Sequence, residues 1–127
     1  MTKDEVKVFA LDIAEVLSNK KGRDVVVIDA SDVTPLFDYI VIATADSLVH
    51  MNALVNYTED RLNVLKVSRI NKKNSYPETP WLLIDCGFML VHLFLDEARS
   101  FYSLEKLWAD GVIIYKDSKD NISMSSG

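Results

Sequence analysis

Residues 81–94, WLLIDCGFMLVHLF, form an apolar stretch that is interrupted by one aspartate, one histidine and a central glycine. Gly87 can adopt the positive φ that a tight hairpin loop needs, so the stretch predicts two antiparallel strands joined by the two-residue loop Cys86-Gly87. In this arrangement the paired residues are Asp85 with Phe88, Leu83 with Leu90, and Trp81 with His92.

The predicted hairpin has two unlike faces, because successive side chains of a strand point to opposite sides. One face is wholly aliphatic and suits a core packed against helices; its residues are Leu82, Ile84, Met89, Val91 and Leu93. The other face includes a carboxylate and an imidazole, which an aliphatic core does not need, so it is either functional or partly open to water. Its residues are Trp81, Leu83, Asp85, Phe88, Leu90, His92 and Phe94.

Two amphipathic helices precede the hairpin. Thr2 and Glu5 form a capping-box pattern, in which each would satisfy a backbone donor of the other at the start of the first helix. That helix is predicted to stop at the glycine of Lys20-Lys21-Gly22. The second helix is predicted to begin at Asp46 or Ser47, since either side chain can accept a hydrogen bond from the first turn.

Strands are predicted on both sides of the second helix. The β-branched runs 24–30 and 39–44 indicate strands covered on both faces. The link between them is too short for a helical crossover, so we expect an antiparallel pair. Weaker patterns predict short strands at 66–71 and 111–115, and short helical turns at 96–102 and 103–108.

The predicted fold is α/β. The chain has 127 residues, which suits a single small domain over residues 1–116 with a mixed sheet of about five strands flanked by helices. Residues 117–127 contain little that could be buried and are predicted to be a mobile C-terminal tail.

Composition excludes several classes of function. The formal net charge is -5, so a nucleic-acid binder would have to gather its basic residues on one face. The densest basic stretch, Arg69, Lys72 and Lys73, is typical of a solvated loop. No apolar run approaches the length of a membrane span, and residues 1–20 resemble neither a signal nor a transit peptide. We therefore expect a cytoplasmic protein.

Nothing in the sequence indicates catalysis or a cofactor. In the predicted register Asp85 and His92 lie roughly 13 Å apart, too far for a hydrogen bond. Cys86, the only cysteine, lies beside Asp85, whose charge raises the thiol pKa. His50 has one carboxylate within helical reach, Asp46, which does not make a metal site. Glycine-rich phosphate-binding motifs are absent from the sequence. We expect no enzyme, no metal and no cofactor.

Two interpretations of the polar hairpin face remain. It is either a buried face with a hydrogen-bonded histidine, or a patch where another protein docks. The second is favoured by aromatic residues around the hairpin, because aromatic side chains dominate protein interfaces. These aromatic residues are Trp81, Phe88, Phe94, Tyr102 and Trp108, with Asp85, Glu97, Arg99 and Glu105 as a charged rim.

Several motifs then point to a known family. They are Asp29, Asp38-Tyr39-Ile40-Val41-Ile42-Ala43-Thr44, Ser47, His50, Trp81-x-x-Ile84-Asp85-x-Gly87, Val91-His92-x-Phe94, Arg99 and Tyr102-x-Leu104-Glu105-Lys106-Leu107-Trp108. In this combination the chain resembles the ribosomal silencing factor family (RsfS, also called Iojap-like), from the first helix to about residue 110.

The resemblance implies a nucleotidyltransferase-like fold without catalytic groups. It implies binding to the large ribosomal subunit through the fourteenth large-subunit ribosomal protein, which blocks association with the small subunit and represses translation under nutrient limitation. Some relatives assist large-subunit biogenesis. Carried over by position, the partner-binding residues are Trp81, Leu83, Asp85, Cys86, Phe88, His92, Phe94, Tyr102, Leu107 and Trp108.

Four points stay open at this stage. They are a peripheral contact with ribosomal RNA, a homodimer of the free protein, and two alternative functions: a degenerate nucleotidyltransferase-like enzyme and a homo-oligomeric interaction module.

Overall fold

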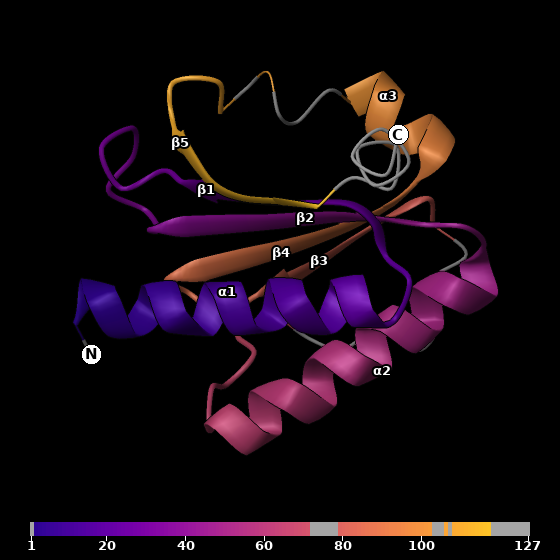
Figure 1. The fold of residues 1–127 in the computed structure, drawn as a ribbon, viewed down its shortest axis with the longest axis horizontal. Coiled ribbons are helices and arrows are strands. Elements are labelled where there is room, and N and C mark those ends of the chain that lie inside the picture. The colour runs from indigo at the N-terminus through magenta and orange to yellow at the C-terminus, as the bar shows by residue number, and fades with distance from the viewer. Residues whose placement is uncertain (1, 72–78, 103–105, 107, 118–127) are drawn as a thin grey trace, which may run out of the picture.

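The computed structural model describes residues 2–71, 79–102, 106 and 108–117. Its elements in chain order are α1 (Lys3–Asn19), β1 (Arg23–Asp29), β2 (Tyr39–Ala45), α2 (Leu48–Leu65), β3 (Trp81–Asp85), β4 (Met89–Leu95), α3 (Asp96–Tyr102) and β5 (Val112–Asp117). They build one five-stranded sheet with helices on both sides (Figure 1), which confirms the predicted α/β class. In the described part of the chain, no helix is long and apolar enough to cross a membrane.

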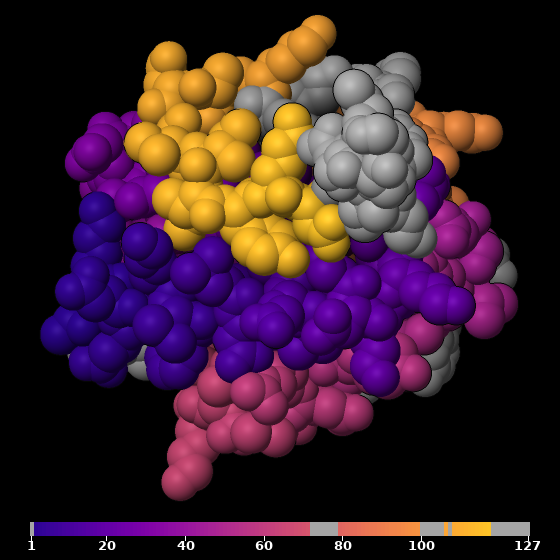
Figure 2. Space-filling view, in the orientation of Figure 1, coloured from indigo at the N-terminus to yellow at the C-terminus, as the bar shows by residue number. Residues whose placement is uncertain are grey.

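The sheet is mixed, with strand order β3-β4-β2-β1-β5. β2 pairs parallel with β4 and antiparallel with β1, so the antiparallel pairing expected for the first two strands is confirmed. Every residue of β2 is buried, as its central place requires. α1 and α2 cover one face of the sheet and α3 lies on the other (Figure 1). β5 lies beside α1 (Figure 2), where the hydroxyls of Ser18 and Tyr115 are 2.9 Å apart.

The helix ends differ in detail from the predictions. Thr2 Oγ1 accepts the Glu5 N–H at 3.2 Å, but the Glu5 carboxylate accepts from the Thr2 hydroxyl and not from its backbone. Ser47 caps α2. At the end of α1 the left-handed residue is Lys21, with φ 69°. Gly22 is needed there for close approach, because an added Cβ would lie 2.8 Å from the carbonyl oxygen of Leu17.

The strand predicted at 66–71 is wrong. Lys66 adopts a left-handed conformation with φ 59° and turns the chain sharply as it leaves α2. The Ile70 N–H then reaches the Asp85 carbonyl oxygen at 2.6 Å, while further bonds to β3 come from side chains. This mixed bonding leaves no backbone ladder, so no strand forms.

The C-terminal strand is displaced from its predicted place. β5 begins at Val112 and still pairs at Asp117 with Val25, so the sheet reaches the first residue of the predicted tail. Residues 118–127, and most of the turn predicted at 103–108, lie outside the described residues. The domain boundary therefore stays a prediction.

The hairpin is confirmed, but its predicted pairing is wrong. Asp85 pairs with Leu90 instead of Phe88, Leu83 with His92 instead of Leu90, and Trp81 with Phe94 instead of His92. The loop is wider because residues 86–88 all lie between the strands, Gly87 has φ 84° and its N–H donates to the Asp85 carboxylate at 2.8 Å. The shift is two residues, and an even shift leaves the side chains of the two strands on their predicted faces; Phe88, now in the loop, is the exception.

The two faces of the hairpin are buried in different layers. The aliphatic face joins the main core between the sheet and α1 and α2, as predicted. The other face contributes to a second, smaller core. Ala98 of α3 is part of this core, and the half-buried Trp108 packs against it with its ring 5.1 Å from that of Phe37. The polar face is therefore partly covered by the protein's own chain.

Trp81, His92 and Phe94 form a stack within this second layer. The Trp81 ring lies 5.2 Å from that of Phe94 and 5.7 Å from that of His92. The indole Nε1–H donates to His92 Nδ1 at 2.9 Å. An indole nitrogen is only a donor, so His92 Nδ1 must be the unprotonated acceptor of a neutral imidazole. The bond thereby fixes the histidine tautomer and holds the indole plane.

Burial lowers the pKa of His92 from 6.5 to about 4. The side chain is only 5% exposed, and a charged imidazolium would lose its hydration there. Protonation would also replace the Nδ1 acceptor with a second donor facing the indole N–H. Both effects favour the neutral ring in the folded protein.

This shift predicts acid sensitivity. Between pH 6.5 and 4 the unfolded chain binds a proton at His92 that the folded chain does not, so stability present above pH 6.5 is lost as the pH falls toward 4. At pH 5 the loss due to this group is about 2 kcal/mol in the free energy of unfolding. Urea unfolding at pH 7.5 and 5 measures it.

His92→Asn is the matched control, because it keeps an acceptor near Nδ1 and does not titrate. Wild type should lose about 2 kcal/mol more than the variant between the two pH values. Equal losses would mean that His92 does not sense acid.

Candidate docking surface

The exposed part of the hairpin is defined here as the ribbon face: Trp81, Leu83 and Asp85 on β3, with Leu90 on β4. All four side chains are half-buried. Trp81 and Leu90 rest against the second core, and Asp85 lies at the hairpin end. The ribbon face therefore has an apolar centre with one carboxylate at its end, as protein interfaces commonly do.

Three predicted partner-binding residues are buried. Cys86 and His92 are 5% exposed and Phe94 is fully enclosed, so the expectation that these side chains lie open to a partner is wrong. Phe94 is enclosed in the second core, beside His92, whereas Cys86 belongs to the main core. His92 and Phe94 instead support Trp81 from within.

Phe88 lies apart from the ribbon face. The wider loop turns it toward the main core, where it packs with its ring 6.3 Å from that of Phe9 on α1. It is half-buried there, beside the hairpin end.

The structure does not bring Trp108 to the ribbon face. Trp108 lines a small hollow of about 80 Å³ with Val26 and Ile28 of β1 and Ile113 of β5, at the other end of the sheet. Of the remaining predicted residues, Leu107 lies outside the described residues, and only the backbone of Tyr102, at the end of α3, is described.

The polar groups of Asp85 form hydrogen bonds within the protein. The Asp85 carboxylate accepts the Gly87 N–H at 2.8 Å, and the Asp85 N–H donates to Asn71 Oδ1 at 2.9 Å.

Burial raises the pKa of the Cys86 thiol to about 11, with a smaller contribution from the Asp85 charge. The thiol is thus protonated at neutral pH and is a poor nucleophile, as its neighbour suggested.

Asp85 and His92 lie closer together than the predicted register implied. The observed register makes Asp85 a diagonal neighbour of His92, at about 7–8 Å, and not an opposite end of the ladder. His92 Nδ1 is nevertheless occupied by the Trp81 indole. A carboxylate cannot orient that nitrogen as it orients a catalytic base.

His50 has a structural role that its sequence position did not reveal. Its Nδ1 accepts the Asp46 N–H at 2.9 Å, and its Nε2 lies 3.0 Å from the carbonyl oxygen of Lys20. The ring thus joins the end of α1 to the start of α2. Across the described residues, no group of three or more histidine, cysteine or acidic side chains is placed to hold a metal ion.

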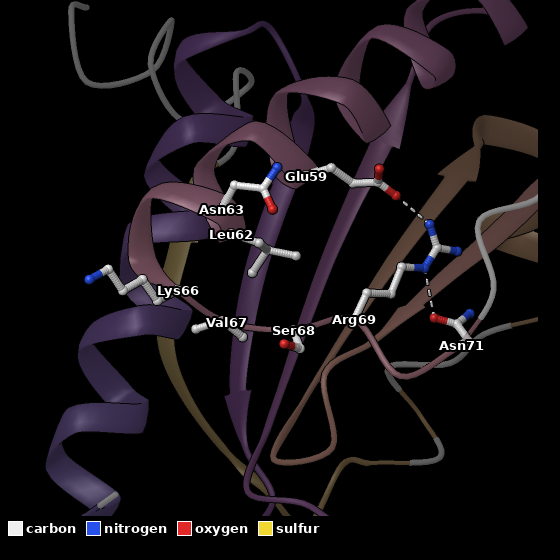
Figure 3. A pocket seen from close by; sticks show the side chains of 8 residues that line it. All are labelled: Glu59, Leu62, Asn63, Lys66, Val67, Ser68, Arg69 and Asn71. Atoms are coloured by element: carbon white, nitrogen blue, oxygen red, sulfur yellow. Dashed lines mark hydrogen bonds and ion pairs between the residues drawn. The ribbon is translucent and has the colours of Figure 1, made fainter.

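Sequence reasoning missed Arg69. The interpretation of 69–73 as a solvated loop is wrong for this residue, whose side chain is 12% exposed and forms an ion pair with Glu59 of α2 at 2.5 Å. Figure 3 shows the open hollow, of about 610 Å³, that this pair borders. The only signal for this ion pair in the sequence is a basic residue ten positions after an acidic residue of the helix. That spacing is too common to predict an ion pair by itself. Lys72 and Lys73 lie outside the described residues.

Comparisons with known proteins agree with the fold. A family described as "Ribosomal silencing factor during starvation" matches residues 3–126. The ribosomal silencing factor RsfS of Treponema pallidum is 36% identical over 102 residues, covering 80% of this chain and 90% of that protein. A crystal structure of a Chromobacterium violaceum protein has a TM-score of 0.73 and 30% identity, covering 86% of this chain and 88% of that one.

An organellar relative is also similar. Mitochondrial assembly of ribosomal large subunit protein 1 of Mus musculus is 34% identical over 101 residues, which cover 76% of this chain but 43% of the mouse protein. The match over nearly the whole chain, together with the shared fold, decides the family. This chain belongs to the ribosomal silencing factor family.

Proposed function

We propose that this protein binds the large ribosomal subunit, prevents it from joining the small subunit and so represses translation when nutrients are limiting. Family membership supports the silencing role. The mouse relative, named for assembly of the ribosomal large subunit, supports contact with that subunit and an additional role in its biogenesis. On this proposal the protein acts in the cytoplasm and without catalysis.

The proposed contact joins the ribbon face to the fourteenth large-subunit ribosomal protein. The observation that carries this proposal is the half-buried Trp81, held at an open strand face by the stack with Phe94 and the bond to His92. A side chain that is already ordered loses little conformational entropy on binding. Tryptophan is also the residue type most enriched at interface hot spots.

Charge favours a protein partner over RNA. The chain has a net charge of -5, and Asp85 adds a carboxylate to the ribbon face. Phosphate backbones repel such a surface, whereas a basic protein patch attracts it and fixes its register. Contact with ribosomal RNA is therefore proposed only at the periphery. The same face, exposed in the free protein, would serve a homodimer that the ribosomal partner displaces.

The direct test is subunit joining. Purified protein added to isolated large and small subunits should reduce the amount of joined ribosomes in a sucrose gradient and should sediment with the large subunit. Unchanged joining at saturating protein would contradict the silencing role. Binding without inhibition would restrict the function to biogenesis.

Trp81→Ala should weaken binding to large subunits by about 2 kcal/mol, roughly thirtyfold in the dissociation constant, because it removes the proposed hot spot. Cosedimentation at varied protein concentration measures the effect. Trp108→Ala is the matched control, since that tryptophan lies at the far end of the same sheet face. Circular dichroism confirms that both variants are folded. Undiminished binding by folded Trp81→Ala would place the interface elsewhere.

Asp85→Asn should weaken binding about fivefold, because the amide still accepts the Gly87 N–H but lacks the charge for a basic partner. The weakening should shrink as salt rises, since salt screens the lost interaction. Asp60→Asn, at an exposed position of α2, is the control. Equal losses in the two variants would show that only the overall charge of the protein matters.

A further inference from the structure

β3 forms one edge of the sheet, so half of its backbone groups point away from β4. The Leu95 N–H of β4 donates to the Pro80 carbonyl at 2.9 Å, which places the groups of even-numbered residues toward β4. The groups of Trp81, Leu83 and Asp85 therefore point outward. An open edge of this kind is a template for pairing with another strand.

The side-chain amide of Asn71 occupies the middle of this edge. Its Nδ2 donates to the Leu83 carbonyl at 2.8 Å, and its Oδ1 accepts the Asp85 N–H at 2.9 Å. In a parallel neighbouring strand, the N–H and C=O of a single residue would make the same two bonds, to residues i and i+2. The Asn71 amide thus takes the place of one residue of a sixth strand.

The two remaining outward carbonyls are also occupied. The Ile70 N–H donates to the Asp85 carbonyl at 2.6 Å, and the Thr79 hydroxyl donates to the Trp81 carbonyl at 3.0 Å. Every outward carbonyl of β3 therefore has a donor from residues 69–71 or 79. An incoming strand would have to compete with these donors for each carbonyl.

Arg69 holds this cap in place. Its Nε donates to Asn71 Oδ1 at 2.8 Å and its Nη2 to the Leu83 carbonyl at 3.2 Å, while Nη1 pairs with Glu59 of α2 at 2.5 Å. Figure 3 shows this chain of bonds, running from α2 through the guanidinium to the asparagine along the hollow. The planar fork of an arginine suits such a role, since it donates in several fixed directions at once.

We propose that Asn71 and Arg69, anchored by Glu59, are positioning residues of the ribbon face: they close the outer edge of β3, so that a partner is recognised by the side chains of the ribbon and not by addition of a strand. This inference rests on the proposed function for its binding consequence. The closure of the edge itself stands on the bonds described above.

Closure matters because the two docking modes compete on the same strand. A strand added to β3 would be held mainly by backbone bonds and would bind with little regard to the side chains. With the edge closed, Trp81, Leu83 and Asp85 become the only features that β3 offers on its exposed face. The cap therefore acts on specificity and also prevents unwanted self-pairing.

Asn71→Ala tests the cap, with Asn63→Ala as its matched control, because Asn63 lines the same hollow and lies outside the bonded chain. Hydrogen exchange should accelerate at least about tenfold at the Asp85 amide in Asn71→Ala and stay unchanged in Asn63→Ala. Sedimentation should show concentration-dependent self-association of Asn71→Ala only. A residue with a merely structural role would lower the unfolding midpoint without causing self-association.

Asn71→Asp keeps the test decisive if the alanine variant does not fold. The carboxylate still accepts the Asp85 N–H but cannot donate to the Leu83 carbonyl. We expect a protected Asp85 amide together with self-association, because the Leu83 carbonyl then keeps only the longer, 3.2 Å bond from Arg69. A variant that stays monomeric at all concentrations tested, with exchange as in wild type, would overturn the proposal.

Binding to large subunits separates this inference from the proposed function. We expect Asn71→Ala to bind about tenfold more weakly than Asn63→Ala. If wild type binds and Trp81→Ala does not, yet Asn71→Ala binds like wild type, the positioning role is overturned and the proposed function stands. If wild type itself fails to bind, the proposed function fails, while exchange and self-association still decide whether the edge is closed.

Discussion

The hydrogen bond from the Trp81 indole to His92 Nδ1 holds the exposed side of the hairpin together. It joins the edge strand β3 to its neighbour β4 by a side-chain contact across the ladder, in addition to the backbone bonds. The bond exists only with a neutral imidazole, and burial keeps the imidazole neutral. Stacking on the enclosed Phe94 then fixes the plane of the indole. A large aromatic surface is thereby presented in one orientation.

The remainder of the molecule supports that arrangement from both sides. The aliphatic side of the hairpin packs in the main core against α1 and α2, so the ribbon face lies on the opposite side of the sheet. From the edge, the Arg69 and Asn71 side chains connect β3 to α2 through Glu59. The hairpin therefore contacts helices in two places: on its aliphatic face, and at the outer edge of β3 through the Glu59 side chain. Contacts of this kind hold side chains in fixed positions, as a precise binding site requires.

Sequence patterns predicted the fold class, the two long helices, the antiparallel first strands and the alternation of the hairpin faces. These features follow from periodicity, which is local and strong in this chain. The register of the hairpin could not be predicted, because Asp85 accepts the Gly87 N–H and so widens the loop. The burial of Phe94 depends on a second core that includes Phe37 and Ile40, which lie far away in the sequence, so no local pattern predicts it. Asn71 was predicted at the end of a short strand, and no local pattern shows that its side-chain amide completes the edge of β3.

The buried thiol of Cys86 has a practical consequence. It is the only sulfhydryl of the chain, it lies in the loop that joins the two strands, and its pKa of about 11 keeps it protonated. Alkylating reagents attack thiolates, so they should spare the folded molecule and modify it only when the loop opens. The native polypeptide therefore contains a built-in chemical probe of hairpin opening, readable by mass spectrometry without any engineered label.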